Sequence, residues 1–103
     1  MGNPMKIRAS VTEGVTEVKV LMQHDMETGR RKDKEGVVIP AWYITDVKVQ
    51  HNGRTVLESQ WGTGISKNPY LSCHFKGGTP GDKITISWVD NMGDSRSDEA
   101  VIA

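Results

Sequence analysis

Hydrophobic and polar residues alternate along much of this chain, which is the spacing typical of half-buried β-strands. The alternation is clearest in four segments, residues 5–11, 17–24, 70–76 and 83–90. In each of them most apolar side chains fall on one face and most polar or charged side chains on the other. No segment keeps the 3.6-residue period of an amphipathic helix for more than a turn or two. The pattern therefore predicts an all-β fold.

Residues 39–61 are the segment around which we expect the other strands to be arranged. Two runs rich in β-branched and aromatic residues flank Asn52-Gly53, and this pair favours a two-residue hairpin turn with positive φ at both positions. Continuous pairing outward from the turn places Val49 opposite Val56 on one face and Ile44 opposite Trp61 on the other. The hairpin therefore either contacts apolar surface on both faces or carries a β-bulge that switches its faces.

The remaining segments complete a pattern of about seven short strands separated by turn residues. Residues 25–36 are polar, highly charged and end in glycine, so we expect a long loop there, and loops of this length are often functional. Residues 95–102 return as a last strand. The chain is predicted to form a single immunoglobulin-like β-sandwich domain over residues 1–103, with either Trp42 or Trp88 in its core.

Composition excludes several classes of function. Lys and Arg together number 13, as do Asp and Glu, so the formal net charge is zero and nucleic acid is not the expected partner. Near-zero net charge also favours association with other proteins. No apolar run has the length of a signal peptide or a membrane span, so we expect a protein without an export signal of its own and with no membrane partner.

Candidate catalytic and metal-binding residues are few. Cys73 is the only cysteine, and because it alternates with Leu71 and Phe75 we interpret it as a small core residue rather than a nucleophile. The three histidines lack the spacing of a metal motif, and no Gly-x-Ser-x-Gly sequence supports a serine nucleophile. We therefore predict no catalytic residue, no metal and no cofactor.

The positive signal is a set of large side chains that cannot all lie in the core if the alternation is right. Exposed aromatic residues and methionine are enriched at protein interfaces, so we predict partner-binding roles for Met26, Tyr43, Trp61 and Tyr70. Arg30, Arg31 and Lys32 form the one compact basic cluster. They are candidates for docking a partner or facing an anion, although the acidic residues around them equally fit a solvated loop.

Several motifs, in their order and spacing, resemble those of SoxZ, the family of the Z subunit of the sulfur-oxidising (Sox) carrier complex. The motifs are VLMQHDMETGRRKD at 20–33, IPAWYI at 39–44, HNG at 51–53, QWG at 60–62, SKNPY at 66–70, GDK at 81–83, WVDNMGD at 88–94 and DEA at 98–100.

The resemblance implies an immunoglobulin-like β-sandwich that forms a heterodimer with a SoxY subunit. In that family the Y subunit bears thiosulfate-derived sulfur on a cysteine of its C-terminal arm, and other Sox enzymes act on the adduct in transient contacts. The Z subunit has no catalytic residue. The Y partner carries the export signal, which implies a periplasmic location for the pair. Residues 99–103 of this chain contain neither a cysteine nor a glycine arm, so it does not match the carrier subunit.

Three functions from different classes follow. The first is the scaffold subunit of such a carrier, in the Sox pathway or a related one, with Trp61 and Tyr70 near the Y subunit and the basic loop near pathway enzymes. The second is a free-standing immunoglobulin-like protein-binding module, which would be stable and monomeric without a partner. The third is a small enzyme that uses Cys73, which would show fast thiol labelling.

Overall fold

The alternating segments form β-strands that pack face to face. The structure, a computed structural model, describes residues 2–103; Met1, which the predicted domain includes, lies outside the described residues. Its seven strands are β1 (Lys6–Thr12), β2 (Val15–Leu21), β3 (Ile44–His51), β4 (Arg54–Gln60), β5 (Tyr70–Lys76), β6 (Lys83–Asp90) and β7 (Ser95–Val101). The predicted all-β fold of about seven strands is confirmed.

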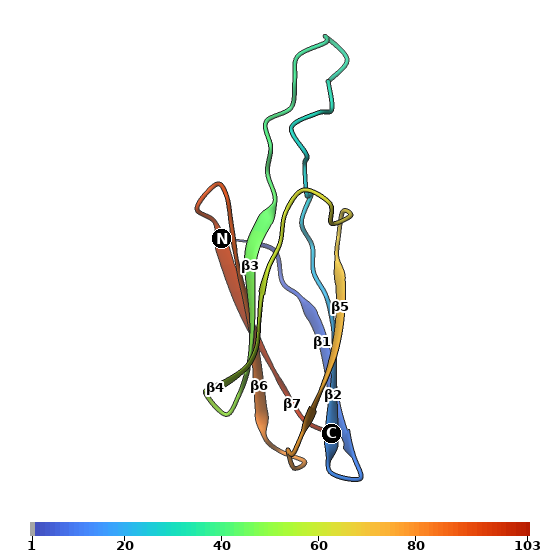
Figure 1. Cartoon of the computed structure of the whole chain (residues 1–103), viewed down its shortest axis with the longest axis vertical. Helices are drawn as coiled ribbons and strands as arrows, with labels where there is room; N and C mark the ends of the chain where they lie inside the picture. Colours follow the sequence, from blue (N-terminus) through green and yellow to red (C-terminus); the bar gives the residue numbers. More distant parts are fainter. Residues whose placement is uncertain (1) are drawn as a thin grey trace.

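Two antiparallel sheets make up the sandwich, one in the order β1-β2-β5 and the other in the order β4-β3-β6-β7. Figure 1 shows the two layers side by side along the long axis of the molecule. Alternate residues of β2, β3 and β6 meet between the layers, and Val18, Val49 and Ile86 are at most 1% exposed. Trp88 is also 1% exposed, so it is the core tryptophan, whereas Trp42 is only half-buried.

The described residues include no helix long and apolar enough to cross a membrane.

The central hairpin pairs across the predicted turn and contains a β-bulge. The two turn residues have φ angles of 48° and 84°, which suit asparagine and glycine. The register shifts after Val49, so Val49 lies opposite Leu57 rather than Val56. Of the two expected arrangements, the hairpin therefore has the β-bulge that switches its faces. Val56 and Leu57 both lie half-buried against the core.

The two long sides of the sandwich differ. On one side the outer edge of β1 is bonded to the C-terminal residues: Ala103 N donates to Ala9 O over 2.9 Å, and Val11 N donates to Ala103 O over 3.3 Å. Nearby, Gly2 N donates to Ser95 O of β7 over 3.1 Å. On the other side β4 and β5 are the edge strands, each with a single neighbour in its sheet. We call this second side the open side.

The tip of the central hairpin is fastened to the start of β6. Asn52 Oδ1 accepts a bond from Lys83 N (2.8 Å), and His51 Nε2 donates to Asp82 Oδ2 (2.8 Å). The Asp82 carboxylate also accepts from Thr79 N over 3.0 Å. These bonds, that from His51 above all, lower the pKa of Asp82 from 3.8 to about 2.

We expect this fastening to be lost in acid. Because the folded pKa of Asp82 lies below its unfolded value, ionised Asp82 stabilises the fold above about pH 4, and the stabilisation disappears as the pH falls towards about 2. Urea unfolding at several pH values should therefore show a wild-type advantage over Asp82→Asn that shrinks on acidification. An advantage that stays constant down to about pH 3 would contradict this assignment.

Candidate partner interface

A long two-legged extension projects beyond both sheets between β2 and β3 (Figure 1). We call residues 27–42 the finger. Its legs are joined at the base, where Glu27 N donates to Trp42 O (2.6 Å) and Trp42 N donates to Glu27 O (2.9 Å). Towards the tip, Asp33 Oδ1 accepts from the backbone amides of Glu35 (2.8 Å) and Val37 (3.0 Å). The predicted long loop is confirmed, and its backbone is ordered by local bonds rather than by a core.

A buried polar cluster holds the base of the finger to the sandwich. Asp90, at the end of β6, accepts hydrogen bonds on Oδ2 from His24 Nε2 (3.0 Å) and Trp42 Nε1 (2.7 Å). The side chains of His24 and Asp90 are 1% and 0% exposed. His24 Nδ1 accepts from Met26 N over 3.0 Å, which fixes the ring as the neutral tautomer with its proton on Nε2.

Both oxygens of the Asp90 carboxylate accept hydrogen bonds. Oδ1 accepts from the backbone amides of Met92 (3.0 Å) and Asp94 (2.9 Å), in addition to the two bonds on Oδ2. Burial raises the pKa of Asp90, but the hydrogen bonds from His24, Trp42 and the two amides lower it more, so it lies below 3.8. The cluster therefore contains a carboxylate anion at neutral pH.

The turn between β6 and β7 supports the returning leg of the finger. Asn91 Oδ1 accepts from Tyr43 N and Asn91 Nδ2 donates to Ala41 O, both over 2.8 Å. Asn91 N also donates to Tyr43 O over 3.0 Å. The sequence assigns residues 90–94 no role beyond their motif, so this supporting role is a finding of the structure.

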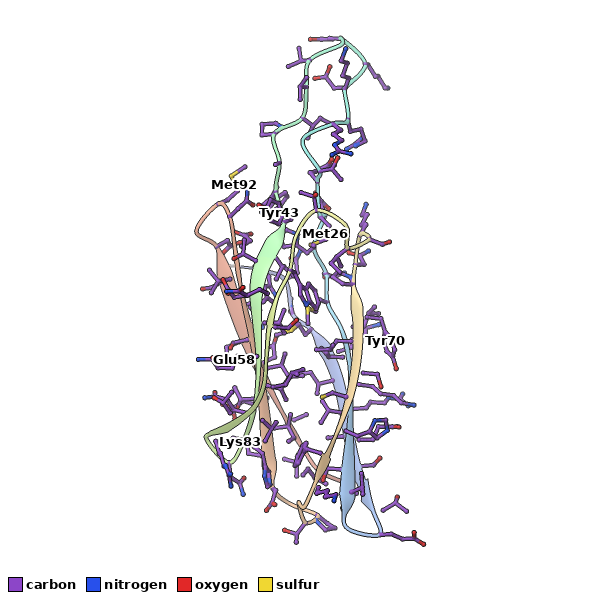
Figure 2. All side chains as sticks on the ribbon, in the orientation of Figure 1. Met26, Tyr43, Glu58, Tyr70, Lys83 and Met92 are labelled. Atoms are coloured by element: carbon purple, nitrogen blue, oxygen red, sulfur yellow. The ribbon has the colours of Figure 1, made fainter. Side chains whose placement is uncertain are left out.

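Met26 is buried, which corrects the sequence prediction for this residue. It is 5% exposed, and its Sδ atom accepts a hydrogen bond from Ile44 N over 3.3 Å. Its φ of 51° turns the chain as it leaves the sandwich, so the alternation that placed it outside does not continue through it. Figure 2 shows Met26 at the base of the finger. The prediction that its side chain is exposed is wrong.

The basic cluster lies on one leg of the finger, but its three members differ. The guanidinium of Arg31 forms an ion pair with Glu27, with Nη2 and Oε1 2.5 Å apart. Arg30 and Lys32 are exposed and form no ion pair with another described residue. Val37 and Val38 on the opposite leg are 58% and 49% exposed. The finger thus offers two free cations and an apolar pair, and Arg31 is engaged within the chain.

The three aromatic candidates occupy different surroundings. Tyr70, the first residue of β5, is 60% exposed and lies on the outer side of the sheet (Figure 2). Trp61 is half-buried against the core, and its Nε1 donates to Ser59 Oγ over 2.9 Å. Tyr43 is half-buried beside the β6–β7 turn, where the exposed Met92 lies (Figure 2). Tyr70 and Trp61 flank the segment that connects β4 to β5, whereas Tyr43 belongs to the base of the finger.

A surface cleft of about 540 Å³ separates the stem of the finger from that connecting segment. Arg31 and Lys67 line it together with Asp25 and Glu27, so opposite charges balance within it. The apolar contribution comes from Ile65 and Met26. The cleft is balanced in charge and is not a strong anion site.

The remaining candidate residues, Cys73 and His74, both lie in strand β5. Cys73 is half-buried, and burial raises the pKa of its thiol, which disfavours the thiolate. His74 Nε2 donates to Glu17 Oε2 over 2.8 Å on the outer face of the sheet. Among residues 2–103 no group of three or more His, Cys, Asp or Glu side chains could hold a metal ion.

Comparison with known proteins relates the chain to one family. The family described as "Sulphur oxidation protein SoxZ" matches residues 5–101. Two solved structures of superoxide reductase (neelaredoxin) variants from Archaeoglobus fulgidus, both in the reduced form, have similar folds. One has a TM-score of 0.62 at 19% identity and covers 99% of this chain and 90% of its own. The other has a TM-score of 0.58 at 20% identity, with coverages of 99% and 87%. At these identities the likeness shows the fold alone. No curated protein matches the sequence.

We expect removal of the Asp90 carboxylate to destabilise the protein. Asp90→Ala leaves the buried N–H of His24 and the part-buried N–H of Trp42 without their acceptor, which should cost about 3 kcal/mol in the free energy of unfolding. Asp46→Ala on the neighbouring strand is the control, because that carboxylate is exposed and should change stability by less than about 0.5 kcal/mol. Equal effects of the two substitutions in urea unfolding would show that the cluster does not stabilise the fold.

Proposed function

Because the chain belongs to the SoxZ family of sulphur oxidation proteins, we propose that it is the non-catalytic subunit of a heterodimeric carrier, paired with a SoxY-like subunit. Family membership makes it a subunit of the Sox pathway, and the match over residues 5–101 is the observation that carries the proposal. The partner's C-terminal cysteine would bear the sulfur adduct. This chain would support the partner and help to present it to other Sox enzymes.

The state of Cys73 supports a non-catalytic role. Its side chain points inward from β5 between Leu71 and Phe75, which pack against the core. Its raised pKa keeps the sulfur as a thiol, whereas nucleophilic attack requires the thiolate. The sulfur chemistry is therefore assigned to the partner's cysteine rather than to Cys73.

The open side supports the pairing with another subunit. Half-buried apolar residues from β4, β5 and their connecting segment lie there, in place of the full burial found in β2 and β6: Val56, Leu57, Trp61, Ile65, Leu71 and Phe75. Partly exposed aromatic and aliphatic side chains at the rim of a core are well suited to an anchor region of an interface. We propose that Trp61 and Tyr70 contact the partner on this side.

The finger supports a second, weaker contact. It extends away from the sheets, and its exposed Arg30 and Lys32 have no competing ion pair among the described residues. Cations on such a projection can attract an acidic surface of a pathway enzyme or the anionic adduct as it passes, and salt would screen the attraction. We propose that the finger guides these transient contacts.

Co-expression with a SoxY-like subunit that carries its export signal tests the proposal. We expect a stable one-to-one complex in the periplasmic fraction, because the partner's signal would carry the folded pair across the membrane. The same chain expressed without the Y subunit is the control and should stay in the cytoplasm. A chain that remains folded and monomeric beside the Y subunit would instead support a free-standing binding module.

Charge reversal on the finger tests its guiding role. The double variant Arg30→Glu with Lys32→Glu should slow turnover of the carrier by Sox enzymes about tenfold at low salt, since each exposed charge contact contributes at most about 1 kcal/mol. Lys6→Glu with Arg8→Glu changes the charge equally on the exposed face of β1 and should have little effect. Both variants should retain the heterodimer. Equal turnover by the two variants would exclude a role for the finger.

A further inference from the structure

Among the four sheet edges of the described residues, the outer edge of β5 is the one that is regular and has no main-chain hydrogen bond to another segment. The outer edge of β1 is bonded at Ala9 and Val11 to Ala103, and the outer edge of β7 is bonded at Ser95 to Gly2. The edge strand β4 contains the register shift opposite Val49, and such bulges hinder the addition of a further strand. By contrast, β5 pairs with β2 over seven residues without any shift.

The hydrogen-bond pattern identifies which main-chain groups of β5 face outward. Gly77 N donates to Gly14 O (2.7 Å) and Met22 N donates to Pro69 O (2.9 Å), at the two ends of the β2–β5 pairing. Hydrogen-bonded and non-bonded pairs alternate in an antiparallel sheet, so this phase assigns the inner bonds to Leu71, Cys73 and Phe75. The N–H and C=O groups that point away from β2 therefore belong to Tyr70, Ser72, His74 and Lys76.

The inward side chains of β5 also fit the addition of a further strand beside it. Leu71, Cys73 and Phe75 pack against the core yet remain half-buried, whereas Val18 and Val20 of the adjacent β2 are each 1% exposed. One more strand beside β5 would cover this row in the way that β5 itself covers β2. Free main-chain groups at a two-residue spacing match the main chain of an extended polypeptide and not the surface of a helix.

We propose that β5 accepts an extended strand of the carrier partner, which adds to the sheet as its fourth strand. This inference rests on the proposed function. The added strand would place apolar side chains beside Leu71 and Phe75 and expose the alternate ones. β5 contains His74 and Lys76 but no carboxylate, so a second copy of β5 would supply no opposite charge. A partner strand with an acidic solvent-facing residue near Lys76 would supply one.

Amide hydrogen exchange, measured by NMR on the labelled chain alone and in complex with the SoxY-like subunit, tests the proposal. In the complex the amides of Tyr70, Ser72, His74 and Lys76 should exchange at least about tenfold more slowly. The alternate amides of Leu71, Cys73 and Phe75 should be protected already in the free chain. The outward amide of Ser97 on β7, on the opposite side of the sandwich, is the internal control and should keep its rate.

A matched pair of proline variants gives a second measurement. Ser72→Pro removes an outward N–H of β5, and Ser97→Pro removes an outward N–H of β7 on the opposite side of the sandwich, without loss of a ladder bond within either sheet. We expect Ser72→Pro to weaken the complex at least about tenfold and Ser97→Pro to weaken it less than about twofold. Thermal unfolding of both variants verifies their folding, and if Ser72→Pro does not fold, the exchange measurement alone decides.

The outcomes separate the two proposals. A complex in which the outward amides of β5 exchange as fast as in the free chain overturns the strand addition and leaves the proposed function standing. Failure to form any complex overturns both. Protection that develops in the chain alone as its concentration rises identifies a second copy as the occupant and overturns assignment to the partner.

Discussion

A buried carboxylate tolerates removal from water only when hydrogen bonds replace its hydration, and Asp90 meets that requirement with four donors. Two donors are side chains, one from His24 just before the finger and one from Trp42 at its end, and two are backbone amides of the β6–β7 turn. One anion therefore fixes the place where the chain leaves the sandwich, the place where it returns and the turn beside them. The direction of the finger depends on this arrangement, since the legs themselves have no hydrophobic core.

Polar groups also need hydrogen-bond partners at the edges of the two sheets, where the main-chain N–H and C=O groups have no neighbouring strand. Unpaired main-chain groups on an edge strand are a liability, and most of these edges are dealt with inside the chain, by residues at its two ends or by the bulge in the hairpin. β5 is the exception, and it borders the region where the core is only partly covered. Under the proposed pairing with a second subunit, an edge strand with unbonded main-chain groups next to a partly covered core is where that subunit would bind.

The strands could be predicted from sequence because alternation depends on burial, and burial is local to each strand. The inward positions of Leu71, Cys73 and Phe75 and those of Ile84, Ile86 and Trp88 followed in this way. The partner of an inward polar residue could not be predicted, because His24 and Asp90 lie 66 positions apart and Trp42 and Asp90 lie 48 apart. Both His24 and Asp90 fall on inward faces, and two inward polar residues of complementary chemistry were the signal available. Met26 was misplaced because a single positive φ interrupted the alternation.

The closure of the β1–β7 side has a consequence for biosynthesis. Met5 N donates to Asp98 Oδ2, a contact between residues 93 positions apart, and Ala103 bonds to Ala9 and Val11. While the second half of the chain is still being synthesised, β1 and β2 have no strands to pack against. The apolar face of the β1–β2 hairpin therefore stays exposed to solvent. Folds dominated by such distant contacts form slowly, on the order of milliseconds to seconds. Chaperones that bind nascent chains would therefore contact this protein chiefly through the β1–β2 hairpin, residues 6–21, before the rest of the sandwich has formed.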